Sequence, residues 1–353
     1  MKKEKYMGLV KIPHAAKEKF ESNFSAIIDK GELAEGAWNN AFANFVKNYT
    51  EAETACPTSS NGAGLLAILI ALRDMYDKKN IFVQSNTMYG VKTLAVSSGL
   101  KYLGAVDCSI SSLMPSADQV KRFISNIELP NQSVFLLSHI GGNINPEIIE
   151  IIDICEKAGV VVVEDCAHSF GSTLNNIHSG LFGFAGVYSL YATKSIPAGE
   201  GGVVVSKNKE IGEIVNKFNI YDRFDRQLNI GVNFRMSEIQ ALFCLSVSEC
   251  IDEIIKNKLS IVKQYEKACS LSKIKFIPSP INGISNHYKF ILVANKNINE
   301  FITIKTRTSQ VYEYALGQDP ENIVKRHICL PTWYMLDDKI VSDVLDQINK
   351  FKS

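Results

Sequence analysis

The stretch from residue 160 to residue 205 constrains the fold of this chain more than any other. It opens with four consecutive valines (160–163), a run too short for a buried helix and typical of a strand buried on both faces in a parallel sheet. Glu164 and Asp165 follow, so we expect them at the carboxyl end of that strand, where open α/β sheets hold their ligands. Ser189 and Lys194 come next, ahead of a glycine-rich turn (residues 199–202) and a second apolar strand.

An acid at a strand end, a hydroxyl and a lysine before a glycine turn suit one cofactor, pyridoxal 5′-phosphate (PLP). PLP needs a carboxylate beside its pyridinium nitrogen, donors for its phosphate and a lysine amine for a Schiff base. We expect Asp165 to hold the ring nitrogen protonated and Lys194 to be the reactive amine. Taken alone, Asp165 could instead cap a helix, but the downstream lysine favours the cofactor role. Glu164 should point to the opposite face of the strand.

A second candidate site precedes a long apolar helix expected within residues 56–77. Small residues run from Thr58 to Gly64 just before that helix. The free amides and the dipole of a helix N-terminus favour phosphate. Taken alone, a turn of small residues before a helix more often only caps the helix than binds phosphate. The presence of Lys194 downstream makes phosphate binding the favoured interpretation here.

Strands and helices alternate through the middle of the chain. The pattern predicts strands at residues 80–84, 102–106, 133–138 and 160–164, and helices at residues 116–127 and 146–158. Such alternation indicates right-handed βαβ units, and therefore an α/β fold with a mostly parallel central sheet flanked by helices. A lone histidine after the third of these strands, His139, is more often structural than catalytic, and we assign it no chemical role.

The ends of the chain complete the expected architecture. We predict helices at residues 14–30, 38–49 and 337–351, and a long helix after Ser237, which would form a capping box with Gln240. Residues 1–245 would form an N-terminal segment with a large domain, and residues 246–353 a smaller C-terminal α+β domain. Strands in the smaller domain are expected at residues 274–277 and 288–293.

Composition and charge exclude several classes of partner. The 353 residues carry a formal net charge of +1, which gives no electrostatic reason to expect nucleic acid or an acidic membrane. No stretch has the apolar length of a membrane span, and the lysines at the start are not followed by the apolar region of a secretion signal. The eight cysteines lack C-x-x-C spacing, so we expect free buried thiols, no metal site and a cytoplasmic location.

Three blocks around the candidate residues resemble the signatures of the DegT/DnrJ/EryC1/StrS sugar aminotransferases. They are EDCAHSFG (164–171), YSLYATKSIPAGEGG (188–202) and GVNFRMSEIQA (231–241), and the resemblance runs from about Ile12 to about Ile340. Members of that family are PLP-dependent homodimers of fold type I. The resemblance therefore implies an enzyme that moves an amino group, with L-glutamate as its source, onto a nucleotide-linked keto-deoxy-sugar for amino-sugar or polysaccharide biosynthesis. Pyridoxamine phosphate would be the intermediate form of the cofactor.

The resemblance also implies roles for single residues near the cofactor. Ser189 falls at a phosphate-binding position, and His168 would lie near the 3′-oxygen or beneath the ring. Lys194 would act as the general base and acid for the proton shift. The phosphate-cradling turn of the family falls on Gly62, Ala63 and Gly64. Because Ala63 replaces the usual threonine, its contact would come from the backbone amide.

Two further positions bear on the ring and on the neighbouring subunit. Met88 lies where the family presents an aromatic side chain that stacks on the ring, and Tyr89 beside it is the alternative. Asn233 matches the residue that contacts the phosphate bound by the partner subunit, so the homodimer would share its active sites. Arg235 is more plausibly structural or interfacial.

The chain departs from the family pattern near its C-terminus. The segment from Thr308 to Trp333 is shortened, which could open the sugar pocket to a larger or different acceptor. No dense basic cluster for a diphosphate is visible, and the candidates are Arg223, Arg226 and Arg235.

Two other functions stay open from the sequence. One is a PLP- or pyridoxamine-phosphate-dependent sugar dehydratase of the same family. Its members that keep the pyridoxamine form carry histidine in place of the lysine, so Lys194 disfavours it. The other is a catalytically silent regulatory or binding protein. Ala63 and Met88 favour that function, whereas the set of Asp165, Ser189 and Lys194 disfavours it.

Overall fold

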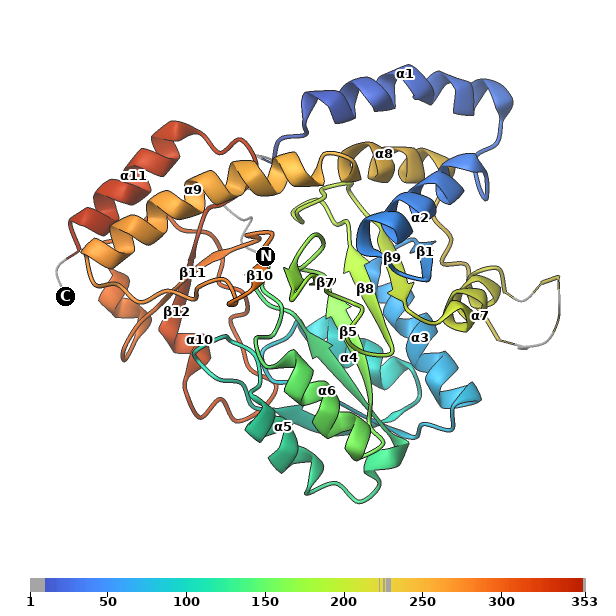
Figure 1. Ribbon diagram of the computed structural model, residues 1–353, viewed down its shortest axis with the longest axis horizontal. Coiled ribbons are helices and arrows are strands. Elements are labelled where there is room, and N and C mark those ends of the chain that lie inside the picture. Colours follow the sequence, from blue (N-terminus) through green and yellow to red (C-terminus); the bar gives the residue numbers. More distant parts are fainter. Residues whose placement is uncertain (1–9, 222, 225, 227–229, 352–353) are drawn as a thin grey trace.

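A seven-stranded sheet forms the centre of the large domain in the computed structural model, which describes residues 10–221, 223–224, 226 and 230–351 (Figure 1). β9 runs antiparallel to both of its neighbours, whereas the other adjacent strand pairs are parallel. The strands lie in the order β1 (Thr54–Thr58), β9 (Gly202–Ser206), β8 (Ala185–Ser189), β5 (Val161–Cys166), β4 (Ser133–Ser138), β2 (Asn80–Gln84) and β3 (Lys101–Val106). The predicted α/β fold with a mostly parallel sheet is confirmed.

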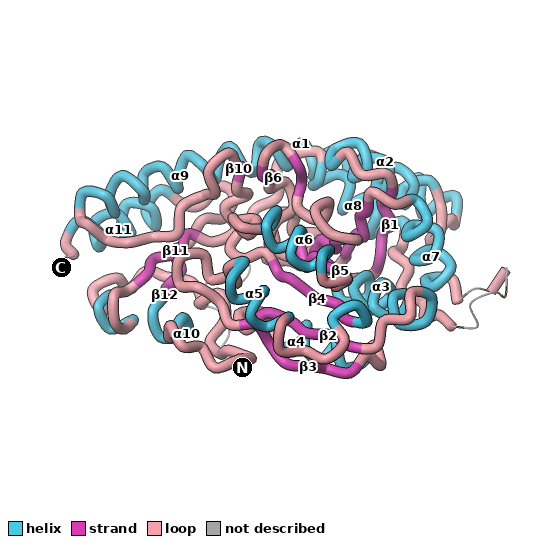
Figure 2. The backbone as a smooth tube through the Cα atoms, turned by 60° about the horizontal axis from the view of Figure 1, so that its bottom comes forward, coloured by secondary structure: helices cyan, strands magenta, loops and turns pink. Residues whose placement is uncertain are grey.

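Helices cover both faces of the sheet, as the alternation of strands and helices predicts (Figure 2). One face, which includes Val163, packs on α3 (Asn61–Met75), α4 (Tyr89–Ser97) and α7 (Lys209–Asn219). The other face, which includes Val162, packs on α5 (Ala117–Ile124) and α6 (Ile148–Lys157), and further along the sheet on α2 (Ala37–Thr50) and α8 (Glu238–Ser248). Alternate valines of β5 thus enter different cores, which explains why the run is continuously apolar.

The C-terminal part of the chain builds a second core. Its elements are α9 (Ile251–Leu271), β11 (Phe290–Val293), β12 (His327–Leu330) and α11 (Asp338–Asn349). The short helix α10 (Ile323–Arg326) packs through Ile323 in a smaller, separate cluster. The first turns of α9 pack with the large domain through Ile251 and Ile254, whereas its later turns, from Ile261 onward, pack with the second core. α1 (His14–Lys30) lies along α8 at the top of Figure 1. Among the described residues, no helix has the length and apolar character needed to cross a membrane.

The single long helix expected after Ser237 is instead two helices. α8 ends at Ser248 and α9 begins at Ile251. The expected capping box is also only half formed. The Ser237 hydroxyl accepts from the Gln240 amide at 3.2 Å, but the Gln240 side chain donates to the Glu200 carbonyl at 2.5 Å. That second bond ties the start of α8 to the glycine-rich turn.

Short segments of the C-terminal part reach back onto the large domain. β10 (Gly283–Ile284) pairs with β6 (Thr173–Leu174), which in turn pairs with β7 (Ile177–His178). The Asn286 side chain donates to the carbonyls of His168 and Phe170, at 2.9 Å in each case. Segments distant in sequence therefore meet at the carboxyl ends of the parallel strands.

Candidate active site

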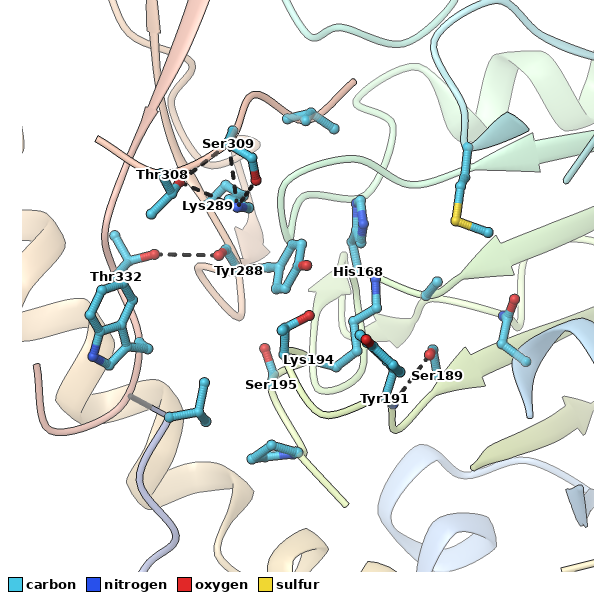
Figure 3. A pocket seen from close by; sticks show the side chains of 18 of the residues that line it. His168, Ser189, Tyr191, Lys194, Ser195, Tyr288, Lys289, Thr308, Ser309 and Thr332 are labelled. Atoms are coloured by element: carbon cyan, nitrogen blue, oxygen red, sulfur yellow. Dashed lines mark hydrogen bonds between the residues drawn. The ribbon is translucent and has the colours of Figure 1, made fainter. Parts of the chain in front are cut away.

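A cavity of about 850 Å³ lies at these strand ends. Figure 3 shows it from close by. Six of the residues predicted from the sequence line it, namely Gly62, Met88, Asp165, His168, Ser189 and Lys194. Three others do not line it, namely Ala63, Gly64 and Asn233.

Asp165 is buried at the end of β5 and is held by three donors. Its Oδ1 accepts from the Asn61 side chain and from the Ala167 amide, both at 3.1 Å, and its Oδ2 accepts from the Ser138 hydroxyl at 3.2 Å. Burial raises the pKa of Asp165, and the three donors together with the charge of Lys194 oppose that rise. A carboxylate fixed in this way faces a cation with little reorganisation.

Glu164 serves the opposite face of β5, as predicted. Its carboxylate accepts from the amides of Gly180, Phe182 and Gly183 at 2.7–2.8 Å, and it pairs with His139 Nε2 at 2.8 Å. His139 Nδ1 accepts from the Asn145 amide at 3.2 Å, so Nε2 is the atom that donates to Glu164. These contacts fix the loop before β8 and leave His139 with a structural role.

Lys194 lies on the loop between β8 and β9, and hydrogen bonds between backbone atoms of that loop hold its two ends together. The Leu190 amide donates to the Gly201 carbonyl and the Ala192 amide donates to the Gly199 carbonyl, each at 2.9 Å. Gly201 has φ +140°, a conformation that side-chain-bearing residues rarely adopt. The loop directs Lys194 into the cavity, where Nζ lies 4.8 Å from the centre of the Tyr288 ring.

His168 stacks on Tyr288, the same ring that lies beside Lys194. Its imidazole lies 4.4 Å from the Tyr288 ring centre at an interplanar angle of 26°. Burial, followed by the charges of Lys194 and Lys289, holds the pKa of His168 well below its usual value, so the imidazole is neutral. Its Nδ1 is buried and has no hydrogen-bond partner among the described residues. A neutral ring with one unused polar atom can bind a planar polar ligand.

The turn before α3 differs in detail from the expected phosphate cradle. The Ser60 hydroxyl caps the helix by accepting from the Ala63 amide at 3.1 Å, and the Ser60 carbonyl accepts from the Gly64 amide at 3.2 Å. Both amides are therefore engaged. Gly64 serves packing, because a β-carbon there would lie 2.8 Å from Val187 Cγ1 on β8. The residues of the turn that line the cavity are Ser60, Asn61 and Gly62.

Of the two candidates for stacking on a ring, Met88 is the one that borders the cavity. It immediately precedes α4 and lines the cavity, whereas Tyr89 does not. The Tyr89 amide instead donates to the hydroxyl of Tyr314, and Lys92 lies over the Tyr89 ring. The geometry favours Met88, and its contact with a ring stays a prediction.

Asn233 and the three candidate arginines lie away from the cavity of their own chain. Asn233 is exposed and its side chain accepts from the Arg235 amide at 3.3 Å. Arg223 and Arg235 both pair with Glu35, at 2.7 and 3.4 Å. Arg226 is exposed and does not line the cavity.

The expectation that the site offers no basic cluster is wrong. Five cationic side chains besides Lys194 line the cavity: Lys11, Lys258, Lys289, Lys305 and Arg307. Among the described residues, none of the five takes part in an ion pair with a carboxylate. They come from four segments far apart in the chain, so no local sequence pattern could show their convergence.

The shortened C-terminal segment forms a wall of the cavity. Residues 308–313 line it, and the Lys289 ammonium joins this wall by bonds to Thr308 Oγ1 at 3.3 Å and to the Ser309 carbonyl at 3.4 Å (Figure 3). Tyr312 stands above His168 at a ring-centre distance of 6.1 Å. This segment places a polar and aromatic edge over the site, and its effect on which acceptor the pocket takes stays a prediction.

Comparisons with known proteins agree with this geometry. A profile of the DegT/DnrJ/EryC1/StrS aminotransferase family matches residues 14–309. GDP-perosamine synthase of Escherichia coli O157:H7 is 22% identical over 355 residues, covering 91% of this chain and 94% of that protein. GDP-perosamine synthase of Vibrio cholerae is 26% identical over 240 residues, covering 65% of this chain and 60% of that protein. PseC of Helicobacter pylori, an aminotransferase involved in the biosynthesis of pseudoaminic acid, has the same fold, with a TM-score of 0.83 at 16% identity over 97% of each chain.

Proposed function

The chain belongs to the DegT/DnrJ/EryC1/StrS aminotransferase family, and we propose that it is a PLP-dependent transaminase that moves an amino group from L-glutamate onto a nucleotide-linked 4-keto-6-deoxyhexose. One observation carries this proposal. Asp165, His168 and Lys194 meet in one cavity whose remaining cations form no ion pair with a carboxylate of the described residues. The E. coli and V. cholerae relatives are named as synthases of a GDP-linked sugar, which supports a sugar nucleotide as acceptor.

The residues present fit PLP on chemical grounds. Asp165 is a buried carboxylate that suits a pyridinium nitrogen, and His168 offers a neutral ring face with an unused nitrogen. The phosphate would be held by the turn at Ser60 and Gly62 and by the Ser189 hydroxyl, all of which line the cavity. When bound, PLP supplies an electron sink that stabilises negative charge at the reacting carbon.

Proton transfer in this proposal belongs to Lys194. Its Nζ takes a proton from the α-carbon of the amino donor and later delivers one to the carbon of the acceptor that gains nitrogen. The closed loop between β8 and β9 and the Tyr288 ring direct this amine. Asp165 contributes by keeping a fixed negative charge where the bound ring needs a positive partner. The lysine at this position also argues against the dehydratase alternative.

The exposed cations suit the diphosphate of a sugar nucleotide. Lys11, Lys305 and Arg307 are exposed residues that line the cavity. A diphosphate bound among them would leave the attached hexose to extend inward, toward Lys194. Binding of this kind weakens with rising salt because the contacts are solvent-exposed.

The acceptor half-reaction tests the proposed function. We expect the pyridoxamine form of the protein to regain the absorbance of the PLP form when a 4-keto-6-deoxyhexose linked to GDP, UDP or dTDP is added, with an amino-sugar nucleotide as product. Simple 2-oxo acids serve as controls, and 2-oxoglutarate should also react because it is the keto product of the donor. Turnover with 2-oxo acids and with none of the sugar nucleotides would remove this chain from sugar metabolism.

We also propose that the active species is a homodimer whose sites are completed by Asn233 of the partner subunit. The supporting observation is that Asn233 is exposed and outside the cavity of its own chain. The test mixes a Lys194→Ala chain with an Asn233→Ala chain. Because a two-fold heterodimer would hold one site with both defects and one intact site, random mixing should restore about one quarter of the parent activity. No recovery after confirmed subunit exchange would contradict shared sites.

A further inference from the structure

Lys258 is a buried cation to which the proposed reaction assigns no task so far. It lies on α9, is 3% exposed and lines the same cavity as Lys194. Ile254, one helical turn earlier, lines the cavity as well, so this face of α9 forms part of the cavity wall. The side chain therefore faces the space that the substrates would occupy, although it is closed off from bulk water.

The contacts of Lys258 with the described residues include no carboxylate that would balance its charge. Its ammonium donates to the hydroxyl of Ser195, the residue after Lys194, at 3.2 Å. The titratable groups that face it are Lys289, which repels it, and His287, whose own pKa burial and Lys258 lower to about 4. Among the described residues, no carboxylate forms an ion pair with Lys258.

An ammonium in this position destabilises the empty protein. Taking a charge out of water without a counterion is costly, and here burial and the repulsion by Lys289 lower the pKa of Lys258 to about 7. A buried cation that faces a binding cavity, and that pairs with no carboxylate of the described residues, is a candidate for ligand binding. An anionic group that enters the cavity would supply the missing charge and favour the protonated lysine.

The position of Lys258 decides which anion it receives. The exposed cations Lys11, Lys305 and Arg307 form an outer tier, whereas Lys258 is buried and bonded to the neighbour of Lys194. In a sugar nucleotide the hexose separates the diphosphate from the reacting carbon. In an α-amino acid the carboxylate is attached to the reacting carbon itself. The inner cation therefore matches a carboxylate, and the outer tier matches a diphosphate.

We propose that Lys258 and Ser195 form the subsite for the α-carboxylate of the amino donor. This assignment rests on the proposed transaminase function, and it names the residue that distinguishes the donor from the acceptor. The two substrates then use different cations of one cavity, which lets a small amino acid and a large sugar nucleotide react in turn at the same lysine.

Measuring the donor and acceptor half-reactions separately distinguishes binding of the donor carboxylate by Lys258 from a general effect on the site. For Lys258→Met in the PLP-loaded protein we expect kcat/KM for L-glutamate to fall about 10- to 100-fold, the loss typical of a charge-assisted hydrogen bond. The acceptor half-reaction, started from the pyridoxamine form with a keto-sugar nucleotide, should be unchanged. Lys305→Met, the matched control from the outer tier, should weaken the acceptor half-reaction and spare the donor half-reaction.

Two further measurements identify the group that Lys258 contacts. L-Isoglutamine, in which the α-carboxylate of glutamate is an amide, should be a poor donor for the parent, and Lys258→Met should cause no additional loss with it. The donor half-reaction of the parent should weaken as the pH rises above about 7, because Lys258 then loses its proton. Lys258→Arg should retain the reaction and lose that pH dependence, since arginine stays charged.

A binding measurement checks the subsite without any turnover. Glutarate, a dicarboxylate without an amine, should bind the parent and the Lys305→Met variant in calorimetry, and bind Lys258→Met about 10-fold or more weakly. Lys258→Met should melt no lower than the parent at pH 7, because it removes an unbalanced buried charge.

Unchanged glutamate kinetics in Lys258→Met would overturn the assignment, as would equal loss in both half-reactions or loss in the acceptor half-reaction alone. A parent protein that performs neither half-reaction would contradict the proposed function itself. In that case, glutarate binding that still depends on Lys258 would support a carboxylate subsite without the transaminase function. Glutarate binding that does not depend on Lys258 would contradict the subsite as well.

Discussion

Replacing Lys194 with alanine should abolish transamination while leaving the fold intact. Loss of a positioned general acid and base alone lowers a rate by about 10²–10⁴-fold, and this lysine would also supply the nucleophile. Lys194 is held by a loop whose closing bonds are between backbone atoms, so its side chain is not needed to keep the loop. The measurement is the rate of amino-sugar formation from L-glutamate, together with the melting temperature.

A surface lysine provides the matched control for this variant. Lys157, which is exposed and pairs with Asp153 one turn away on α6, can be changed to alanine in the same way. Lys157→Ala should retain the full rate. If Lys194→Ala kept a rate near that of the parent, the reaction would use another amine and the proposed proton transfer would be wrong.

Replacing Asp165 with asparagine should lower turnover by about 10²–10³-fold, the range found when a preorganised electrostatic partner is removed. Asparagine keeps the shape and can still accept the bonds from Asn61 and Ala167, but it has no charge to hold a pyridinium. Burial raises the pKa of Asp165 in the folded protein above its value in the unfolded chain. At a pH where the carboxylate is ionised in both states, its charge therefore costs folding free energy. Asp165→Asn without cofactor should therefore melt no lower than the parent at pH 7.

Replacing Glu164, which lies on the opposite face of β5, should lower the melting temperature, in contrast to replacing Asp165. Each oxygen of the Glu164 carboxylate accepts two donors, Phe182 and Gly183 at Oε1 and Gly180 and His139 at Oε2. Glu164→Gln would turn one of these oxygens into an amide nitrogen, so two buried donors would lose their acceptor. Such a loss costs about 1–3 kcal/mol of folding free energy, and the melting temperature should fall. If Asp165→Asn melted early and kept a normal rate, Asp165 would be the structural acid and this account would be wrong.

Local sequence patterns were enough to predict most strands of the central sheet and the residues of the chemical centre. The valine run, the acid that follows it and the glycine turn after Lys194 lie within one stretch of the chain, so the sequence shows their order directly. β5 and β9 fall where the patterns place them, and α1 and β4 have the predicted bounds. β1, α4 and α7 were not predicted, because short mixed stretches such as residues 54–58 carry no clear period.

Convergence in space is what the sequence could not show. Asn61 orients Asp165 across 104 positions of sequence, and Tyr288 reaches Lys194 from the C-terminal part of the chain. The cations of the cavity are single lysines and arginines scattered among apolar and polar neighbours, which look like ordinary surface residues in the sequence. Gly64 was assigned to phosphate because packing glycines and anion-binding glycines look alike before the partner strand is known.

Trapping the cofactor covalently tests the central claim most directly. The PLP-loaded protein is reduced with borohydride, digested and mapped by mass spectrometry, with the Lys194→Ala variant treated in parallel. The account predicts a pyridoxyl group on Lys194 of the parent, and none on any lysine of the variant. A pyridoxyl group on Lys258, Lys289 or another lysine of the parent, or no modification after the cofactor has been shown to bind, would contradict it.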